Sequence, residues 1–173
     1  AISPAFENMF QHDESILEHK LNPLSLAYTS TPFRGLDLLV DAFPAIRQNK
    51  PTVELDIFSS MKVYMYDDER EKEFAPLYDL CRTTDGINYH GSIPQTQLAE
   101  ALKHTTCFAY PNSFAETACV AIMEAMAAGC LIVTSGFGAL PETTAQYAKL
   151  VGGAIGSSEY IESFNSAVTV VLD

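Results

Sequence analysis

Two glutamates stand eight positions apart in FAETACVAIMEAMAAG, residues 114–129, a stretch that is expected to form a single helix. On one helix, Glu116 and Glu124 would be separated by roughly 80° around the axis and by about 12 Å along it. Carboxylates that flank a scissile glycosidic bond in hydrolases lie roughly 5 to 9.5 Å apart, so this spacing disfavours a two-carboxylate hydrolase. The pair is better suited to contacting two separate parts of one long ligand.

Each glutamate also has a structural interpretation. Ser113 and Glu116 match the capping-box pattern, in which an N-cap serine and a glutamate three residues later satisfy amides at the start of a helix. The residues around Glu124 are apolar nearly all round, which predicts a buried helix. Because burying an unpaired charge is very costly, Glu124 then requires partners, either in a ligand or within the protein.

The composition fits one globular domain, since the chain has 173 residues of which 47% are hydrophobic. Its four cysteines are widely spaced and form no Cys-x-x-Cys motif, so we interpret them as reduced thiols rather than as disulfides or zinc ligands. No stretch approaches the roughly 18 uninterrupted apolar residues of a membrane span, and the N-terminus lacks the basic and apolar regions of a signal peptide. A soluble, cytoplasmic protein is therefore expected.

The charge balance is acidic, with 10 Lys and Arg against 22 Asp and Glu and a formal net charge of −12. Nucleic-acid binding depends on clustered basic side chains that neutralise phosphates, and the sequence has no such cluster, so no nucleic-acid partner is expected. A small phosphate ligand remains compatible with this charge. Its site would have to rely on a helix N-terminus and one or two cations.

Short apolar segments alternate with helical patterns after an irregular or partly helical lead-in. Proline is expected to kink or divide the first helix at Pro44 and to interrupt the second at Pro76, and Gly129 is expected to end the fourth. The strands are predicted at residues 24–28, 53–58, 87–90, 106–110, 130–134 and 149–151, and the helices at 36–46, 67–81, 94–104, 114–128 and from about 158.

This alternation predicts a doubly wound, mostly parallel α/β sheet of the Rossmann-like type. Ligands of such sheets bind beyond the carboxyl ends of the strands. Arg34, Ser92 and Glu116 each follow a predicted strand. We therefore expect these three side chains to converge on that edge of the sheet.

Residues 114–142, FAETACVAIMEAMAAGCLIVTSGFGALPET, resemble the signature of the group 1 retaining glycosyltransferases, the glycogen-synthase-like enzymes of the GT-B fold. The shared features are a Glu-x7-Glu motif, a helix end of small residues, a Val-rich strand and a Gly-Ala-Leu-Pro-Glu loop. Residues 28–43 are similar to that family's first strand–loop–helix, and residues 89–102 to its base-binding loop and helix. The resemblance spans roughly residues 24–172 in the expected order.

The resemblance implies that the chain is one half of a two-domain enzyme. In this family the C-terminal Rossmann-like domain binds the donor nucleotide sugar, and the N-terminal one binds the acceptor. Residues 24–173 would then form the donor-binding domain and residues 1–23 an interdomain lead-in, without the N-terminal acceptor domain of the same enzyme. The isolated domain is expected to be nearly inactive.

The implied reaction moves a sugar from a nucleoside-diphosphate sugar to an acceptor hydroxyl, and the sequence leaves open whether the acceptor is a glycan, a lipid or a protein. Two other functions remain open. One is a non-catalytic module that binds nucleotide sugars. The other is an epimerase of similar architecture that acts on the nucleotide sugar itself.

The resemblance also implies roles for individual residues. Glu124 would bind the ribose hydroxyls and Glu116 the hydroxyls of the donor sugar. The amides of Thr117 and Ala118, near the start of the same predicted helix, could receive the sugar or the diphosphate. Arg34 matches the basic residue that neutralises the leaving diphosphate, a form of electrostatic transition-state stabilisation. The structural alternative for Arg34 is a surface ion pair, which contributes little.

The chain departs from the family at Thr29 and Ser30, where the family usually has Gly-Arg with the arginine as a second phosphate cation. Hydroxyls such as that of Ser30 could do this work together with backbone amides, Lys62 after the second strand could replace the arginine, or donor affinity could be reduced. Ser92 and Ile93 match the backbone segment that reads the base. Alternatively, Ser92 is the N-cap of the following helix.

No Asp-x-Asp motif occurs in the sequence, and its histidines lack metal-ligand spacing. Together with the family resemblance, this predicts a metal-independent transferase with no cofactor besides its nucleotide-sugar substrate. No Gly-x-Gly-x-x-Gly follows the first predicted strand, which disfavours a dinucleotide-dependent oxidoreductase.

Overall fold

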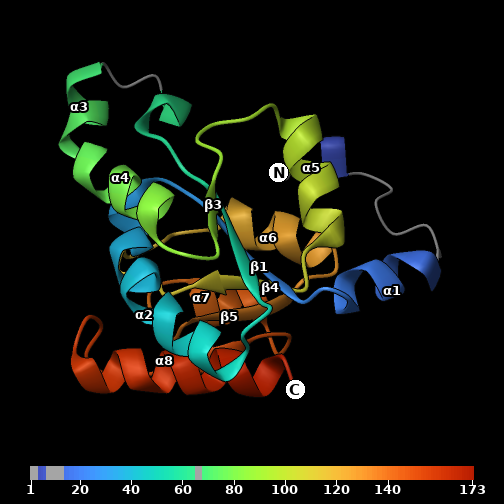
Figure 1. Ribbon diagram of the computed structural model, residues 1–173. Helices are drawn as coiled ribbons and strands as arrows, with labels where there is room; N and C mark the ends of the chain where they lie inside the picture. The colour runs from blue at the N-terminus through green and yellow to red at the C-terminus, as the bar shows by residue number, and fades with distance from the viewer. Residues whose placement is uncertain (1–3, 7–13, 65–67) are drawn as a thin grey trace.

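The computed structural model describes residues 4–6, 14–64 and 68–173, and within them six parallel strands form one sheet (Figure 1). The strand order is β3-β2-β1-β4-β5-β6, with every neighbouring pair parallel. The strands are β1 (Ser25–Thr29), β2 (Glu54–Phe58), β3 (Ile87–Tyr89), β4 (Cys107–Tyr110), β5 (Leu131–Ser135) and β6 (Lys149–Val151).

Helices connect consecutive strands and cover both faces of this sheet, with α2, α4 and α8 on one face and α5 and α6 on the other (Figure 1). The α-helices are α1 (Glu14–Leu21), α2 (Leu36–Asn49), α3 (Asp68–Glu73), α4 (Ala75–Thr83), α5 (Gln95–His104), α6 (Val120–Ala127), α7 (Leu140–Thr144) and α8 (Ser158–Val171). Short 3-10 turns are η1 (Pro4–Phe6), η2 (Pro32–Arg34) and η3 (Met61–Tyr64).

The central strands β1 and β4 are apolar because helices cover both of their faces. Leu26, Tyr28, Phe108 and Tyr110 are completely buried in these two neighbouring strands. The predicted doubly wound, Rossmann-like α/β sheet is thus confirmed. Each predicted strand is present, with ends that differ by one residue or so.

The helix expected at residues 114–128 is shorter than predicted, since α6 begins only at Val120. Residues 114–119 form a loop instead, so Glu116 and Glu124 do not share a helix and the separation calculated for one helix does not apply. Asn112 holds this loop, because its side chain both donates to the carbonyl of Phe114 and accepts from its amide. Gly129, with a φ of 70°, follows α6 in the left-handed conformation, as expected of a residue that ends a helix.

Proline has different effects in two other helices. Of the two effects expected of Pro44, a kink or a division of the helix, the division does not occur, because α2 continues through it from Leu36 to Asn49. The buried apolar face of α2 offsets the one lost backbone hydrogen bond. The acidic helical region is interrupted as expected, with Pro76 in the first turn of α4, where its missing N–H leaves no gap. Asp67, the predicted start of that region, lies outside the described residues, and α7 was not predicted.

The part of the lead-in that the structure describes packs against α5. The Lys20 side chain is buried and its Nζ donates to the carbonyl oxygens of Leu102, at 3.0 Å, and Thr105, at 2.7 Å, at the end of that helix. Burial lowers the pKa of Lys20. Phe6 is also buried in the hydrophobic core. Cations are favoured at helix C-termini, so Lys20 both caps α5 and attaches α1 to it.

Candidate functional site

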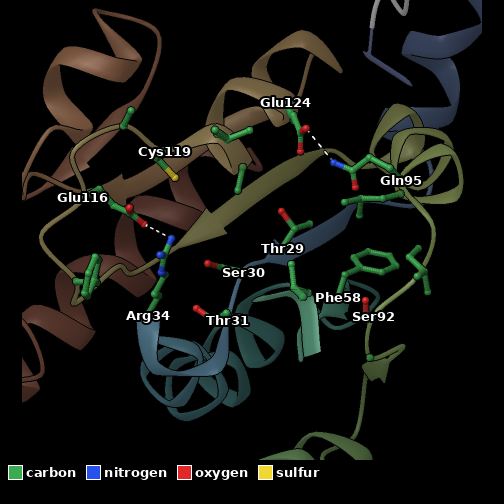
Figure 2. Close-up of a pocket in the computed structure, with 18 of the residues that line it drawn as sticks. Thr29, Ser30, Thr31, Arg34, Phe58, Ser92, Gln95, Glu116, Cys119 and Glu124 are labelled. Atoms are coloured by element: carbon green, nitrogen blue, oxygen red, sulfur yellow. Dashed lines mark hydrogen bonds and ion pairs between the residues drawn. The ribbon is translucent and has the colours of Figure 1, made fainter. Parts of the chain in front are cut away.

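A cavity of about 410 Å³ opens at the carboxyl ends of the central strands, where an α/β sheet is expected to bind its ligand (Figure 2). Its walls come from the ends of β1 and β2, from the loops after β1, β2, β3 and β4, and from the N-terminal parts of α5 and α6. The lining residues are Thr29, Ser30, Thr31, Arg34, Phe58, Val63, Gly91, Ser92, Ile93, Gln95, Leu98, Phe114, Glu116, Thr117, Ala118, Cys119, Val120, Ala121 and Glu124.

The structure brings the predicted site residues together around this cavity, with one exception. Lys62 is exposed in η3 and does not line it, although its neighbour Val63 does. The residues that do line it come from the loops after β1, β3 and β4 and from α6, and they are Ser30, Arg34, Ser92, Ile93, Glu116, Thr117, Ala118 and Glu124.

The two buried carboxylates occupy opposite ends of the cavity, as Figure 2 shows. Glu116 lies at one end beside Arg34, and Glu124 lies at the other end beside Gln95. The hydroxyl-bearing segment from Thr29 to Thr31 lies between them (Figure 2). The proposed contacts with two parts of one long ligand thus remain geometrically possible, although the single helix assumed for them is absent.

Glu116 is held by charge and by hydrogen bonds. Arg34 Nη1 donates to Glu116 Oε1 at 2.8 Å, and the Tyr110 hydroxyl donates to the same oxygen at 3.0 Å. The Arg34 guanidinium also lies over the rings of Phe33 and Phe114, 5.5 and 4.9 Å from their centroids. Because the Arg34 side chain is only 18% exposed, this ion pair is unlike a solvated surface pair.

The capping-box interpretation of Glu116 is wrong. The N-cap of α6 is Cys119, so neither Ser113 nor Glu116 belongs to the start of that helix. The Glu116 backbone is instead fixed by the Gly-Ala-Leu-Pro-Glu loop, since its carbonyl accepts from the amide of Ala139 at 2.9 Å. Gly138 makes this approach possible, because a Cβ there would lie 2.8 Å from the Glu116 amide nitrogen.

The other end of the cavity combines an amide, a carboxylate and an aromatic ring. Gln95 Nε2 donates to Glu124 Oε1 at 2.9 Å, from the first residue of α5. The N-cap of α5 is Pro94, so the alternative role of Ser92 as that cap is wrong. Phe58 lines the cavity, while its ring stacks on His90 with centroids 4.7 Å apart.

The middle of the cavity is polar but carries little positive charge. Among its lining residues Arg34 is the cation, against the two glutamates. Thr31 is buried, and its Oγ1 has no hydrogen-bond partner among the described residues, so a ligand oxygen would satisfy it. Burial raises the pKa of Cys119 to about 11, which keeps this thiol protonated and poorly nucleophilic at neutral pH.

Three residues of this site were not predicted from the sequence, namely Gln95, Tyr110 and Thr31.

Within residues 4–6, 14–64 and 68–173, no group of three or more His, Cys, Asp or Glu side chains is arranged to hold a metal ion. All four cysteines are buried free thiols. Over the same described part of the chain, every helix is too short or too polar to cross a membrane.

Solved structures of glycosyltransferases share this architecture. The chain superimposes on WaaG, a glycosyltransferase involved in lipopolysaccharide biosynthesis, with a TM-score of 0.69 and 14% identity over 99% of this chain and 45% of that one. Sucrose-phosphate synthase from Thermosynechococcus elongatus superimposes with a TM-score of 0.71 and 19% identity, over 95% of this chain and 40% of that one. HepE from Anabaena, in complex with UDP-glucose, superimposes with a TM-score of 0.61 and 15% identity, over 95% of this chain and 50% of that one.

At these identities the likeness establishes the fold, that of one Rossmann-like half of a GT-B glycosyltransferase, and the chain spans half or less of each of these proteins. No curated protein sequence matches the chain. The family model of group 1 glycosyl transferases, however, matches residues 24–173. The chain therefore belongs to the group 1 glycosyltransferase family.

Proposed function

We propose that this chain is the donor-binding domain of a retaining, metal-independent glycosyltransferase of the cytoplasm, which moves a sugar from a nucleoside-diphosphate sugar to an acceptor hydroxyl. The observation that carries the proposal is the placement of Glu116 with Arg34 at one end of the cavity and Glu124 with Gln95 at the other. A nucleotide sugar has hydroxyls at both ends and a diphosphate between them. The UDP-glucose bound by HepE is a ligand of this class.

The nucleoside occupies the Glu124 end in this proposal. Glu124 accepts hydrogen bonds from the ribose hydroxyls, and Gln95 keeps its carboxylate oriented. The backbone of Ser92 and Ile93, which lines the same region, reads the base. Hydrogen bonds to a charged group are worth about 1.5 to 3 kcal/mol each, so Glu124 contributes a large part of the nucleoside affinity.

The sugar and the bond to be broken lie at the Glu116 end. Glu116 accepts from hydroxyls of the donor sugar, and the backbone amides of Thr117 and Ala118 face the sugar or diphosphate from the loop before α6. When the bond between the anomeric carbon and the diphosphate breaks, negative charge grows on the leaving oxygen. Arg34 stabilises that charge. The acceptor oxygen forms the new bond to the anomeric carbon and its proton passes to the leaving diphosphate, so the products are the glycosylated acceptor and the free nucleoside diphosphate.

The diphosphate has one cation among the cavity-lining residues, where the family usually provides two. Ser30 and Thr31 take the place of the second cation in our proposal, because both hydroxyls line the cavity between its two ends. Thr31 Oγ1 has no partner among the described residues and would donate to a phosphate oxygen. Lys62 contributes only if η3 moves toward the cavity.

The remaining partner in this proposal is an N-terminal acceptor domain of the same enzyme, which completes the cleft. The chain alone then binds the donor and transfers its sugar very slowly. The acceptor, whether a glycan, a lipid or a protein, would bind beside Glu116 at the sugar end of the cavity.

Calorimetry tests the proposal with the three pairs UDP and UDP-glucose, GDP and GDP-mannose, and ADP and ADP-glucose. We expect at least one pair to bind, with the affinity of the nucleotide sugar above that of the bare diphosphate. Absence of heat and of any thermal shift with all six ligands at millimolar concentration would overturn the donor-site assignment. Product analysis with labelled donor and the two-domain enzyme separates transfer from epimerisation and from binding alone.

A further inference from the structure

Three side chains from separate segments form a hydrogen-bonded chain below the sugar end of the cavity. Ser30 Oγ lies 3.3 Å from the Tyr110 hydroxyl, which lies 3.0 Å from Glu116 Oε1. Tyr110 is completely buried at the end of β4 and packs against the rings of Tyr28 and Phe108, whose centroids both lie 5.6 Å away. Its ring is thus fixed by packing, and its hydroxyl points at the carboxylate.

The direction of the donors follows from the chemistry of the three groups. An ionised carboxylate only accepts hydrogen bonds, so the single proton of the Tyr110 hydroxyl goes to Glu116. In the unliganded cavity Ser30 then donates to the phenol oxygen rather than accepting from it, and it releases that oxygen when it donates to the diphosphate. Burial raises the pKa of Tyr110, so this phenol keeps its proton at neutral pH. Tyr110 is therefore a permanent neutral donor to Glu116.

The other donor to Glu116 has a second task. Arg34 binds the same oxygen, Oε1, and the proposed function requires its charge for the diphosphate. When Arg34 turns toward a diphosphate, Glu116 loses a strong, charged hydrogen bond. A buried carboxylate without a donor is unfavourable and free to change rotamer, so a second donor is needed to hold it in place.

We propose that Tyr110 is a positioning residue for Glu116: its hydroxyl holds the carboxylate in the orientation that binds the donor sugar after Arg34 has turned to the diphosphate. This inference rests on the proposed function and extends it to a residue outside the cavity lining. Tyr110 itself touches neither the sugar nor the diphosphate. It acts only through Glu116.

Tyr110→Phe tests this inference, because it removes one hydroxyl and leaves the packed ring. Calorimetry with the three ligand pairs named above gives the sugar contribution as the ratio of the Kd of the bare diphosphate to that of the nucleotide sugar. For Tyr110→Phe we expect this ratio to fall about tenfold, the value of one hydrogen bond to a charged group, with the bare diphosphate bound as before.

The matched control is Tyr160→Phe, which removes another buried hydroxyl, one that lies 2.8 Å from Ser135 Oγ and away from the cavity. For Tyr160→Phe we expect the ratio of the two Kd values to equal that of the wild type. Glu116→Ala provides the second comparison, since a hydroxyl that acts only through Glu116 has no further effect once that carboxylate is gone.

The outcomes separate this inference from the proposed function. Wild-type protein that binds none of the six ligands overturns both. Wild-type protein with a clear sugar contribution that Tyr110→Phe leaves unchanged overturns the role of Tyr110 alone, as does a loss of equal size in the Glu116→Ala background.

A measurement on the wild-type chain covers the case in which Tyr110→Phe does not fold. A crystal structure with the bound nucleotide sugar is expected to keep the Tyr110 hydroxyl within hydrogen-bond distance of Glu116 while Arg34 contacts the diphosphate. A bound structure in which Tyr110 has released Glu116 overturns the inference.

Discussion

Arg34 and Glu116 form an ion pair across the sugar end of the cavity, with Nη1 2.8 Å from Oε1, although the proposed function gives each of them a different part of the donor. The Glu116 carboxylate is thus bound to the guanidinium group that, in the proposed function, contacts the diphosphate. In the proposed function, donor binding therefore exchanges one anion for another at Arg34. Because of this exchange, mutation of Glu116 and mutation of Arg34 should have different effects on diphosphate binding.

Glu116→Gln should tighten the binding of a bare nucleoside diphosphate, because the competing negative charge at Arg34 is removed. We expect about a fivefold lower Kd, corresponding to roughly 1 kcal/mol for a partly exposed pair. The same variant should lose the additional affinity for the nucleotide sugar. Calorimetry measures both constants, with the melting temperature as control. A weaker bare diphosphate would mean that Glu116 supports Arg34 rather than competing for it.

Arg34→Lys should not be a conservative change. Lysine keeps the positive charge but cannot place a planar guanidinium over Phe33 and Phe114 while it also binds Glu116. We expect diphosphate affinity to fall about three- to tenfold, with a larger loss for Arg34→Ala. Titrations with the diphosphate that the wild type binds best test the order. Equal affinity of the lysine variant and the wild type would show that charge alone is used.

Glu124→Gln should weaken nucleoside diphosphate binding by about tenfold or more, since ribose hydroxyls donate more strongly to a carboxylate than to an amide. The 2′-deoxy form of the same diphosphate supplies the control ligand. It has lost one of the donors, so the substitution should cost it less. A folded variant that binds both forms like the wild type would leave Glu124 with only its structural partner, Gln95.

Gly138→Ala should destabilise the protein and disturb the sugar end together. Gly138 has a φ of 59°, and the added methyl group would lie 2.8 Å from the Glu116 amide nitrogen. Strain of this kind costs about 1 to 3 kcal/mol, which lowers the melting temperature by several degrees. Gly152→Ala is the matched control, because no atom lies within 4 Å of its added Cβ. Equal melting temperatures of the two variants would contradict the tight packing at Gly138.

The sheet could be predicted from the sequence because each strand is a short apolar run between helical patterns. Val53–Phe58 and Cys130–Thr134, for example, are bounded by turn residues and by helical segments, and both formed strands. These signals are local. They do not depend on distant residues. The order of the elements, and the edge of the sheet at which the site residues meet, could therefore be predicted from them.

The conformation around Glu116 could not be predicted in the same way. Residues 114–119 have helical neighbours and a capping-box pattern, yet distant contacts keep them out of the helix. The amide of Ala139 bonds to the Glu116 carbonyl, and Asn112 holds the backbone of Phe114. Tertiary hydrogen bonds override local propensity here.

The partners of the two glutamates escaped detection for a related reason. Tyr110 lies in an apolar strand, where a tyrosine is indistinguishable from a core residue. Gln95 lies in the first turn of a helix, where polar residues are common. The one available signal was the cost of burying Glu124, which required donors without naming them.

Helix α5 is fastened at both of its ends. Lys20 Nζ holds the carbonyl oxygens of Leu102 and Thr105 at one end, and Gln95 reaches Glu124 from the other. A helix of this length is a stiff rod of about 15 Å. Lys20 and Gln95 thus attach the two ends of one helix to α1 and to Glu124, so that in the proposed function the lead-in helix and the nucleoside end of the cavity are joined through α5.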